Sequence, residues 1–556
     1  MKKVRFSLLV AMVMVSHALL AQAVEQGKKF LYYQRYKSAK ETFEKVLASN
    51  PNDINAVYWL GQTLLLDPDL KDSVGAKALY QKALQTNGSA PLLLAGIGDI
   101  ELREGKTADA LQHFETAISL TKGKDIGVLN AIGQANADAR NGDAPYAIEK
   151  LNQATLVKNF NNPDTYIIMG DVYRKLIDGG NAVLSYQKAL SLDPKMAAAK
   201  YKIGKVYLTQ NNKEYFLPAF EDAISLDPSY APAYFALFDY WFYRDIDKAA
   251  GYFDKYLAVS DKTDENEYDR VSIIWGRKKY PEAIAAAQQD LAALGANANP
   301  KYYKLIAYAY NDEGDSVNAK INLDQYFAKQ KPDNFIPKDY SFRAQVLSKF
   351  PGNDSLVMQN YQLAIDKDTS FDNKMDLIKE ASDLAKRTGN KPANAFWQGR
   401  MYNLKKNPSN SDLYNWGIAN YQAGNFKTAD SIFCGVYETK YPSEIFGYLW
   451  CARSLRAQDD SANSGGLAVA SYEKLAQQAR SLDSVKYKNQ AVESYFYLAS
   501  YYNDIKKDKP AAISYLKKIL EVDPANTTAP QFISVLEKPA KQPAQKPKPA
   551  AKPNGK

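Results

Sequence analysis

Histidine and cysteine are scarce in this sequence, which contains two of each among 556 residues. A zinc site needs a cluster of these residues, and the sequence has none. The G-x-S-x-G motif of hydrolases and the G-x-x-x-x-G-K-[ST] loop of nucleotide-binding proteins are missing as well. His113 is the one histidine after residue 23, and it stands alone. We therefore predict a protein that is not an enzyme and has no metal or cofactor.

The body of the chain also lacks a strong net charge. The whole sequence carries +9, but the cations gather at its two ends. Lys2, Lys3 and Arg5 stand at the start, and residues 537–556 hold six lysines against one glutamate. The long stretch between them is nearly neutral. A nucleic-acid-binding protein needs a basic face on its folded part, so we predict no nucleic-acid partner.

Long hydrophobic runs are limited to the first residues. A cationic start precedes the apolar run Phe6–Val15 and then Ala21-Gln22-Ala23, which is typical of a secretion signal with a small-x-small cleavage site. The run is shorter than the roughly 20 residues that span a bilayer. We predict a signal peptide over residues 1–23, with an uncleaved membrane anchor as the alternative. The mature chain is then exported without a transmembrane segment, into the periplasm, with association to the outer membrane as a further expectation.

The sequence does contain a repeat with a period of 34 residues. Gly170 recurs as Gly204, and Pro194 recurs as Pro228. Small residues stand where two antiparallel helices would touch, large ones stand beside them, and the proline ends the second helix. We expect Gly179 and Gly180 to make the turn between the two helices. In full, the unit is Tyr166-x2-Met169-Gly170-x2-Tyr173, then Ala182-x3-Tyr186, then Pro194.

This unit resembles the tetratricopeptide repeat (TPR) family, whose pattern is W-x2-L-G-x2-Y, then A-x3-F, then P. The resemblance covers nearly the whole mature chain in about fourteen units. It implies an all-α fold, an α-solenoid or superhelix of helix-turn-helix repeats that pack on their neighbours. We divide the chain into a signal peptide (1–23), an N-terminal array (24–260), divergent TPR-like repeats (261–400), a C-terminal array (401–536) and a Lys/Pro/Ala-rich tail (537–556).

The resemblance also indicates where a partner binds. In the TPR family, ligands usually lie along the inner surface, in contact with the first helix of each repeat. Residues 230–246 ("YAPAYFALFDYWFYRDI") carry more aromatic side chains than the scaffold demands. Packing of these aromatics against the next repeat is the alternative. The predicted partner-binding groove consists of Asp171, Arg174, Tyr201, Lys205, Tyr234, Phe238, Trp241 and Phe242.

Two further segments invite a structural hypothesis. Cys434 and Cys451 lie on either side of the turn Tyr441-Pro442, so an antiparallel hairpin would bring them level. An exported protein meets an oxidising compartment, and either a disulfide or two separate buried thiols fits this placement.

The acidic segment Asp261–Asp269 lacks the glycine and closing glutamate of a calcium loop. We expect it to be a solvated linker.

Together with the predicted signal peptide, the resemblance implies an exported scaffold that holds envelope proteins or peptides, for example in outer-membrane assembly or secretion. The alternative is a glycan- or peptidoglycan-binding envelope protein that uses the aromatic groove and the basic tail. Residues 537–556 combine five prolines with six lysines, and such a composition is expected to be disordered. The tail either keeps the chain soluble or contacts an anionic polymer by charge attraction.

Overall fold

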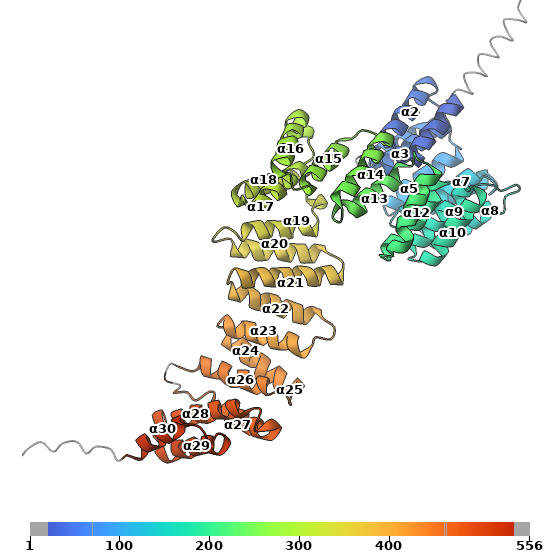
Figure 1. The fold of residues 1–556 in the computed structure, drawn as a ribbon. Helices are drawn as coiled ribbons and strands as arrows, with labels where there is room; N and C mark the ends of the chain where they lie inside the picture. Colours follow the sequence, from blue (N-terminus) through green and yellow to red (C-terminus); the bar gives the residue numbers. More distant parts are fainter. Residues whose placement is uncertain (1–19, 69, 461, 463, 539–556) are drawn as a thin grey trace, which may run out of the picture. The chain divides into compact units, whose positions relative to one another are not determined.

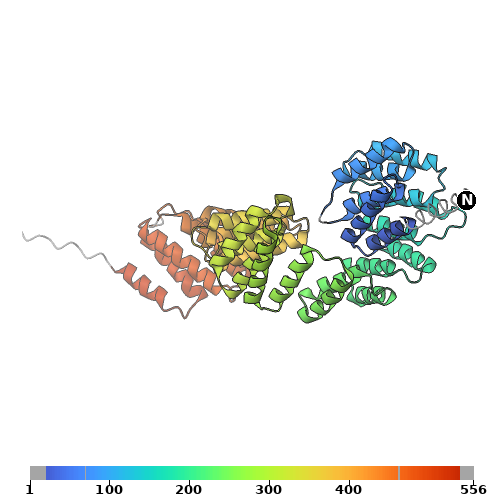
Figure 2. The ribbon, with the colours of Figure 1, turned by 90° about the horizontal axis from the view of Figure 1, so that it is seen from above.

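The computed structural model of this chain describes residues 20–68, 70–460, 462 and 464–538. Most of the predicted signal peptide and the tail from residue 539 onward lie outside the described residues. The described residues form successive pairs of helices (Figure 1 and Figure 2). The first pair is the helix of residues 20–32 with α2 (Tyr36–Ser49), and the fourteenth is α28 (Lys488–Asp504) with α29 (Lys509–Val522), after which α30 (Thr528–Glu537) follows. This confirms the predicted all-α solenoid.

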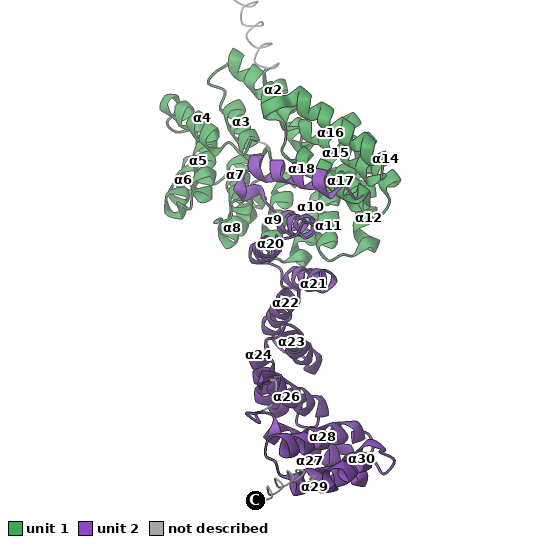
Figure 3. Cartoon of the chain, turned by 90° about the vertical axis from the view of Figure 1, so that its left-hand side faces the viewer, with its two compact units in different colours: residues 1–313 green, residues 314–556 purple. Residues whose placement is uncertain are grey.

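The chain divides into two compact units (Figure 3), and unit 1 comprises Met1–Glu313. After α2, its helices alternate between the first and second members of the repeats. They are α3 (Ile54–Leu66), α4 (Ser73–Thr86), α5 (Pro91–Arg103), α6 (Thr107–Leu120), α7 (Ile126–Asp138), α8 (Ala144–Thr155), α9 (Pro163–Lys175), α10 (Gly179–Leu192), α11 (Ala197–Thr209), α12 (Lys213–Leu226), α13 (Ala231–Phe242), α14 (Ile246–Val259), α15 (Asp264–Gly276), α16 (Tyr280–Leu294) and α17 (Lys301–Glu313).

Unit 2 comprises Gly314–Lys556. In one repeat, the second helix is interrupted by a π-helical turn, η3 (Ser431–Tyr437), which lies between α24 (Phe426–Asp430) and α25 (Glu438–Lys440). In both units, the described residues include no helix with the length and apolar character that crossing a membrane requires. The other helices of unit 2 before α28 are α18 (Ser316–Lys329), α19 (Pro337–Leu347), α20 (Asp354–Lys367), α21 (Phe371–Arg387), α22 (Lys391–Leu404), α23 (Asn410–Gln422), α26 (Ile445–Gln458) and α27 (Val469–Asp483).

Each standard helix pair is held together where a small residue of the first helix meets a large residue of the second. A Cβ atom added to Gly204 would lie 2.6 Å from the ring of Phe220. The ring of Tyr186 covers Gly170 in the same way. Interiors packed this tightly have no room for an added methyl group unless the helices move apart. The glycines of the sequence pattern are therefore required for the contact between the two helices.

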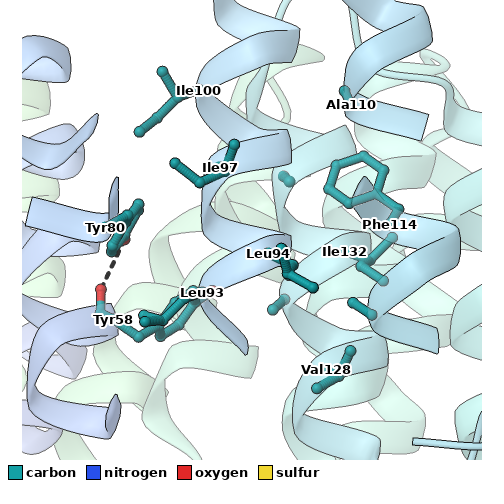
Figure 4. Packing of buried hydrophobic residues seen from close by; sticks show 14 of the residues in the cluster. Tyr58, Tyr80, Leu93, Leu94, Ile97, Ile100, Ala110, Phe114, Val128 and Ile132 are labelled. Carbon is teal, nitrogen blue, oxygen red and sulfur yellow. Dashed lines mark hydrogen bonds between the residues drawn. The ribbon is translucent and has the colours of Figure 1, made fainter. Parts of the chain in front are cut away.

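Neighbouring pairs share one apolar core. Between α3 and α7, the buried side chains include Tyr58, Tyr80, Leu93, Phe114 and Ile132 (Figure 4). The Tyr80 hydroxyl donates a hydrogen bond of 2.8 Å to the backbone carbonyl of Tyr58, so this buried polar group is satisfied. Each repeat thus buries its apolar face against the next repeat, as expected for a solenoid.

The turn between α9 and α10 differs from the sequence prediction. Gly179 and Gly180 do not form the turn, because they are the first two residues of α10. The left-handed residue is Ile177, with a φ of 61° and a side chain that is 93% exposed. A β-branched residue is disfavoured at positive φ. The corresponding turns of two other repeats place Gly105 and Asn211 there, which are better suited.

The acidic segment 261–269 is not a solvated linker. Thr263 caps α15 by accepting a hydrogen bond from the Asn266 N–H. The first turn of this helix is rich in acidic residues, whose negative charges interact favourably with the positive end of the helix dipole. Asp261, which precedes the cap, has a side chain that is only 9% exposed. The acidic residues of this segment therefore start a helix and make a tertiary contact.

Candidate functional site

The first helix pair of unit 1 lies against repeats that come much later in the chain. The Tyr33 hydroxyl donates a hydrogen bond of 2.8 Å to Asp227 across 194 residues of sequence. Arg35 Nε donates to the Asp261 carboxylate at 3.1 Å, and the Ser38 backbone N–H donates to it at 3.0 Å. In Figure 2 the N-terminal helices, in dark blue, lie beside the blue-green helices of later repeats. The superhelix of unit 1 is thus closed on itself.

Aromatic side chains add to this closure. The ring of Tyr32 lies 5.2 Å from that of Tyr230, and the Tyr32 hydroxyl accepts a hydrogen bond of 3.1 Å from the Ala198 N–H. Tyr230 in turn lies 5.6 Å from Tyr201, one of the predicted groove residues. Burial raises the pKa of Tyr201. The ring of Tyr201 therefore supports the closed superhelix and is only partly exposed.

Several repeats converge around Tyr36, at the start of α2. Burial raises the pKa of Tyr36 to about 12, and the nearby Asp67, Tyr201, Asp138 and Tyr256 contribute to the rise. These four residues belong to four different repeats. A single side chain can be close to all of them only if the repeats curve around it. The surface that faces Tyr36 is therefore concave.

Asp138 shows the same curvature from a second direction. Its side chain is exposed, yet its pKa is raised to about 6, mainly by desolvation in the surrounding protein and in smaller part by the charges of Asp99 and Asp171. Exposure and desolvation occur together when a side chain lines a concave surface, because solvent reaches it from one direction only. Asp138 was not among the predicted groove residues, and no feature of its local sequence marks it.

Charged side chains follow this surface from repeat to repeat. Asp99 pairs with Arg103 at 2.8 Å. Asp171, a predicted groove residue, accepts a hydrogen bond of 2.8 Å from the Tyr186 hydroxyl and pairs with Lys202 at 2.7 Å. Both carboxylates are satisfied by neighbours within the protein. Asp171 thus links two adjacent repeats and stabilises the surface.

Two predicted cations lie next to this network. Arg174 is exposed, and its guanidinium is 3.9 Å from Asp171. Lys205 is partly exposed and takes part in no ion pair within the described residues. Desolvation and the nearby Arg174 lower the pKa of the Lys205 ammonium, whereas Asp239 opposes this change. The structure thus brings Arg174 and Lys205 together on the concave surface.

The predicted aromatic residues separate into two groups. Tyr234 and Phe238 are buried, and the ring of Phe238 lies 4.8 Å from that of Phe253 in the next helix. Because α13 and α14 form one helix pair, this contact lies within the repeat and not against the next repeat. Trp241 and Phe242 are partly exposed. Only the second group presents surface to a partner in this structure.

Phe242 is the first of three aromatic residues in a row. Its ring lies 6.5 Å from that of Trp275, nearly parallel to it, and Trp275 lies 5.8 Å from Tyr308. The three residues come from α13, α15 and α17, and all are partly exposed. Sequence analysis missed Trp275 and Tyr308, although each follows its predecessor at a constant interval along the repeats. That interval is the signal that identifies them.

In unit 2, the structure joins Cys434 and Cys451 by a disulfide, with their Cα atoms 4.9 Å apart. Cys434 lies in the π-helical turn η3, and Cys451 lies in α26. The bond therefore connects the second helix of one repeat to the first helix of the next.

His113 Nδ1 in unit 1 lies 2.8 Å from a carboxylate oxygen of Glu101, which gives this histidine a structural contact.

Successive antiparallel helix pairs, each packed on its neighbours, define a helical repeat solenoid. A family model described as "Tetratricopeptide repeat" matches residues 24–76 and 169–231. These two segments of the chain match tetratricopeptide repeats, in agreement with the pattern of small and large residues. Proteins built from such repeats bind protein partners, and the repeats of this chain support a scaffold for protein–protein interaction.

Many solved structures are similar to this chain, including the following three. The C-terminal part of a TPR repeat-containing protein from Cytophaga hutchinsonii has 29% identity over 48% of this chain and 98% of its own, with a TM-score of 0.27. MamA has 23% identity over 31% of this chain and 96% of its own, with a TM-score of 0.24. Yeast Tom70 has 12% identity over 74% of this chain and 97% of its own, with a TM-score of 0.38. No curated protein gives a match.

Proposed function

We propose that this chain is a non-enzymatic, exported scaffold of the bacterial cell envelope that holds protein partners on the concave surface of unit 1. The observation that carries the proposal is the set of side chains that scaffold packing leaves exposed there. Arg174 is exposed, and Tyr243 at the end of α13 has a side chain that is 75% exposed. Desolvation nevertheless raises the pKa of Tyr243, and the nearby Asp239, which also lies near Lys205, contributes to the rise. Exposed aromatic and arginine side chains are enriched where proteins bind one another.

The location in the envelope rests on the sequence and on the cysteines. Residues 1–23 have the composition of a secretion signal. A disulfide between Cys434 and Cys451 would persist in an oxidising compartment and would be rare in the cytosol. Outer-membrane assembly and secretion are the envelope processes for which we propose this scaffold.

Photo-crosslinking in cells tests the partner site. A photoreactive phenylalanine analogue replaces Tyr243 in one strain and Tyr215 in another. Tyr215 is a matched control, because its side chain is 56% exposed but lies on α12, a second helix. We expect the Tyr243 position to capture a small, reproducible set of envelope proteins that the Tyr215 position does not capture. Equal capture at both positions, or none at Tyr243, would contradict the proposed site.

The exported state is tested separately. Osmotic shock should release the chain, and mass spectrometry of the released protein should give a mass that begins at Val24. A chain that stays with the cytosolic fraction and keeps residues 1–23 would show that the envelope assignment is wrong. That result would leave the concave surface as a candidate site in another compartment.

A further inference from the structure

The first helix pair of the chain covers part of the predicted partner-binding groove. Tyr32 and Tyr33, at the turn between its two helices, pack against the apolar core that α9–α13 share. The Tyr32 hydroxyl accepts its hydrogen bond from the N–H of Ala198, which lies one turn before Tyr201 on the same face of α11. Burial raises the pKa of Tyr36, and the nearby Tyr201 is among the groups that contribute. A partner that lies along this face would meet the first pair there.

The cover extends to the first helices on both sides of α11. At the start of α9, burial raises the pKa of Asp164, and the nearby Lys28 of the first pair opposes the rise. Just before α15, Asp261 accepts hydrogen bonds from Arg35 and Ser38. These contacts all lie at the N-terminal ends of first helices. The first pair therefore covers one edge of the concave surface, from α9 to α15.

The forces that hold the first pair against these repeats differ from those between ordinary neighbours. Its apolar side chains Phe43 and Val46 share a buried cluster with Leu60 of α3. Toward α11–α15 it presents hydroxyl groups and the guanidinium of Arg35, together with the ring of Tyr32. Water can replace a polar partner when two surfaces separate, but it cannot replace apolar packing. Opening this closure therefore costs less than separating two ordinary repeats.

Opening the closure changes what the groove offers to a partner. Tyr230 is buried and Tyr201 is partly exposed while the first pair is in place. Withdrawal of Tyr32 uncovers the face of Tyr230 that it contacts, and it frees the carboxylates of Asp227 and Asp261. Aromatic rings are enriched at the centre of protein interfaces. A partner that contacts these groups gains this binding energy in the open form alone, so its binding and the closure compete.

We propose that the first helix pair is an autoinhibitory segment, which occupies the edge of the groove at Tyr201 and Tyr230 and which a protein partner must displace to reach these two rings. The apparent affinity is then limited by the fraction of molecules that are open. The hydrogen bonds of Tyr33 and Arg35 set that fraction. This proposal rests on the proposed function and adds the regulation of the same surface.

Two altered chains shift the closure in opposite directions. Tyr33→Phe with Arg35→Ala removes donors from the first pair, leaves the groove surface unchanged and so favours the open form. Lys37→Cys with Lys262→Cys, bridged by a bis-maleimide, holds the closed form. Both lysines are exposed, and they adjoin in sequence the residues of the closing contact. The native cysteines are joined to each other, so the reagent reaches the introduced thiols only.

Photo-crosslinking at the covered position measures the competition. The purified full chain, with a photoreactive phenylalanine analogue at Tyr201, is irradiated in a solubilised envelope fraction. The protein scored is one that the Tyr243 position captures in cells. We expect its capture at Tyr201 to rise about tenfold in Tyr33→Phe/Arg35→Ala, since the lost hydrogen bonds raise the open fraction by a factor of this order.

Bridging should have the opposite effect. We expect the bridged chain to lose most of the capture at Tyr201 that the same chain shows before bridging. The matched control is Tyr215→Phe with Lys213→Ala, which removes a hydroxyl and a cation from exposed positions on α12 and should leave capture unchanged. Equal capture before and after bridging would overturn the proposal. This comparison decides if the double variant does not fold, because it keeps every donor and acceptor of the closure.

Spin labels on the two introduced cysteines measure the opening without any partner. We expect one short distance between the labels in the otherwise natural chain. A second, longer distance should appear when Tyr33→Phe and Arg35→Ala are added. A single distance that these substitutions leave unchanged would show that the closure does not open, and the proposal would be wrong.

The crosslinking experiment at Tyr243 separates this inference from the proposed function. If Tyr243 captures envelope proteins while bridging leaves capture at Tyr201 unchanged, the scaffold function stands and the autoinhibition is wrong. If Tyr243 captures nothing, the proposed function is wrong, and the autoinhibition falls with it, whatever distances the spin labels show.

Discussion

Replacing Asp261 by alanine removes the acceptor that closes the superhelix of unit 1. Arg35 Nε, the Ser38 N–H and the Ser38 hydroxyl all donate to this carboxylate. A hydrogen bond to a charged group contributes about 1.5–3 kcal/mol. Arg35 is partly exposed and regains water when the bond is lost, so its share is smaller. We expect a net loss of about 2 kcal/mol in the free energy that holds the first helix pair in place.

Hydrogen exchange followed by mass spectrometry measures this loss locally. The contacts of Tyr32 and Tyr33 remain in Asp261→Ala, so the first pair should open without unfolding the rest of unit 1. A change of about 2 kcal/mol corresponds to roughly 30-fold faster exchange, since 1.4 kcal/mol is about tenfold. We expect this acceleration in α2 and none in α7. Asp247→Ala is the control, because Asp247 is exposed and its pair with Arg277 lies on the surface.

Two results would refute this reasoning. Unchanged exchange in α2 would mean that the Asp261 carboxylate does not hold the closure. Equal acceleration in α2 and α7 would mean that the substitution destabilises the whole of unit 1 and that the first pair is not a separate opening unit. The effect of Asp247→Ala should stay within the error of the measurement, and a large effect would invalidate the comparison.

Three further predictions concern stability and the disulfide. Ile177→Gly removes the strain of a β-branched residue in a left-handed conformation and should raise the free energy of unfolding by about 1 kcal/mol in a denaturant titration. A decrease in the free energy of unfolding would show that the turn does not store this strain. Because the pKa of Asp269 is raised from 3.8 to about 7, the folded chain binds this proton more tightly than the unfolded chain, so the associated stability is present at low pH and is lost as the pH rises through about 7. Asp269→Asn should therefore gain thermal stability over the natural chain at pH 8 but not at pH 4, and an equal shift at both pH values would contradict the linkage. The denatured, unreduced chain should show no free thiol, and two reactive thiols would mean that Cys434 and Cys451 are not bonded.

The repeat could be predicted from the sequence because its contacts are local. Gly204 touches Phe220 across a single helix pair, so the same spacing recurs wherever the pair recurs. The closure could not be predicted in this way. Arg35 and Asp261 are 226 residues apart, and neither belongs to the repeating pattern. Nothing in one sequence marks a contact that forms only once the superhelix has completed its turn.

The candidate site was predicted in part for a related reason. The resemblance placed Trp241 and Phe242 on the first helix that faces a partner, and both are partly exposed. Phe238 lies only one turn earlier, yet it is buried against the next helix. Successive residues point about 100° apart around a helix, so a small rotation of α13 decides which aromatic side chains reach the surface. Propensity and spacing do not determine that rotation, whereas packing between repeats does.

The closure of unit 1 also determines the order in which the chain can fold. Repeat proteins ordinarily begin folding at any position and grow by adding neighbours, because their contacts are short in sequence. The contact between Arg35 and Asp261 spans 226 residues, and contacts of such separation form slowly. The first helix pair is also the first part of the body to leave the ribosome. It must therefore wait, with its tyrosines uncovered, until the residues around Asp261 have been made.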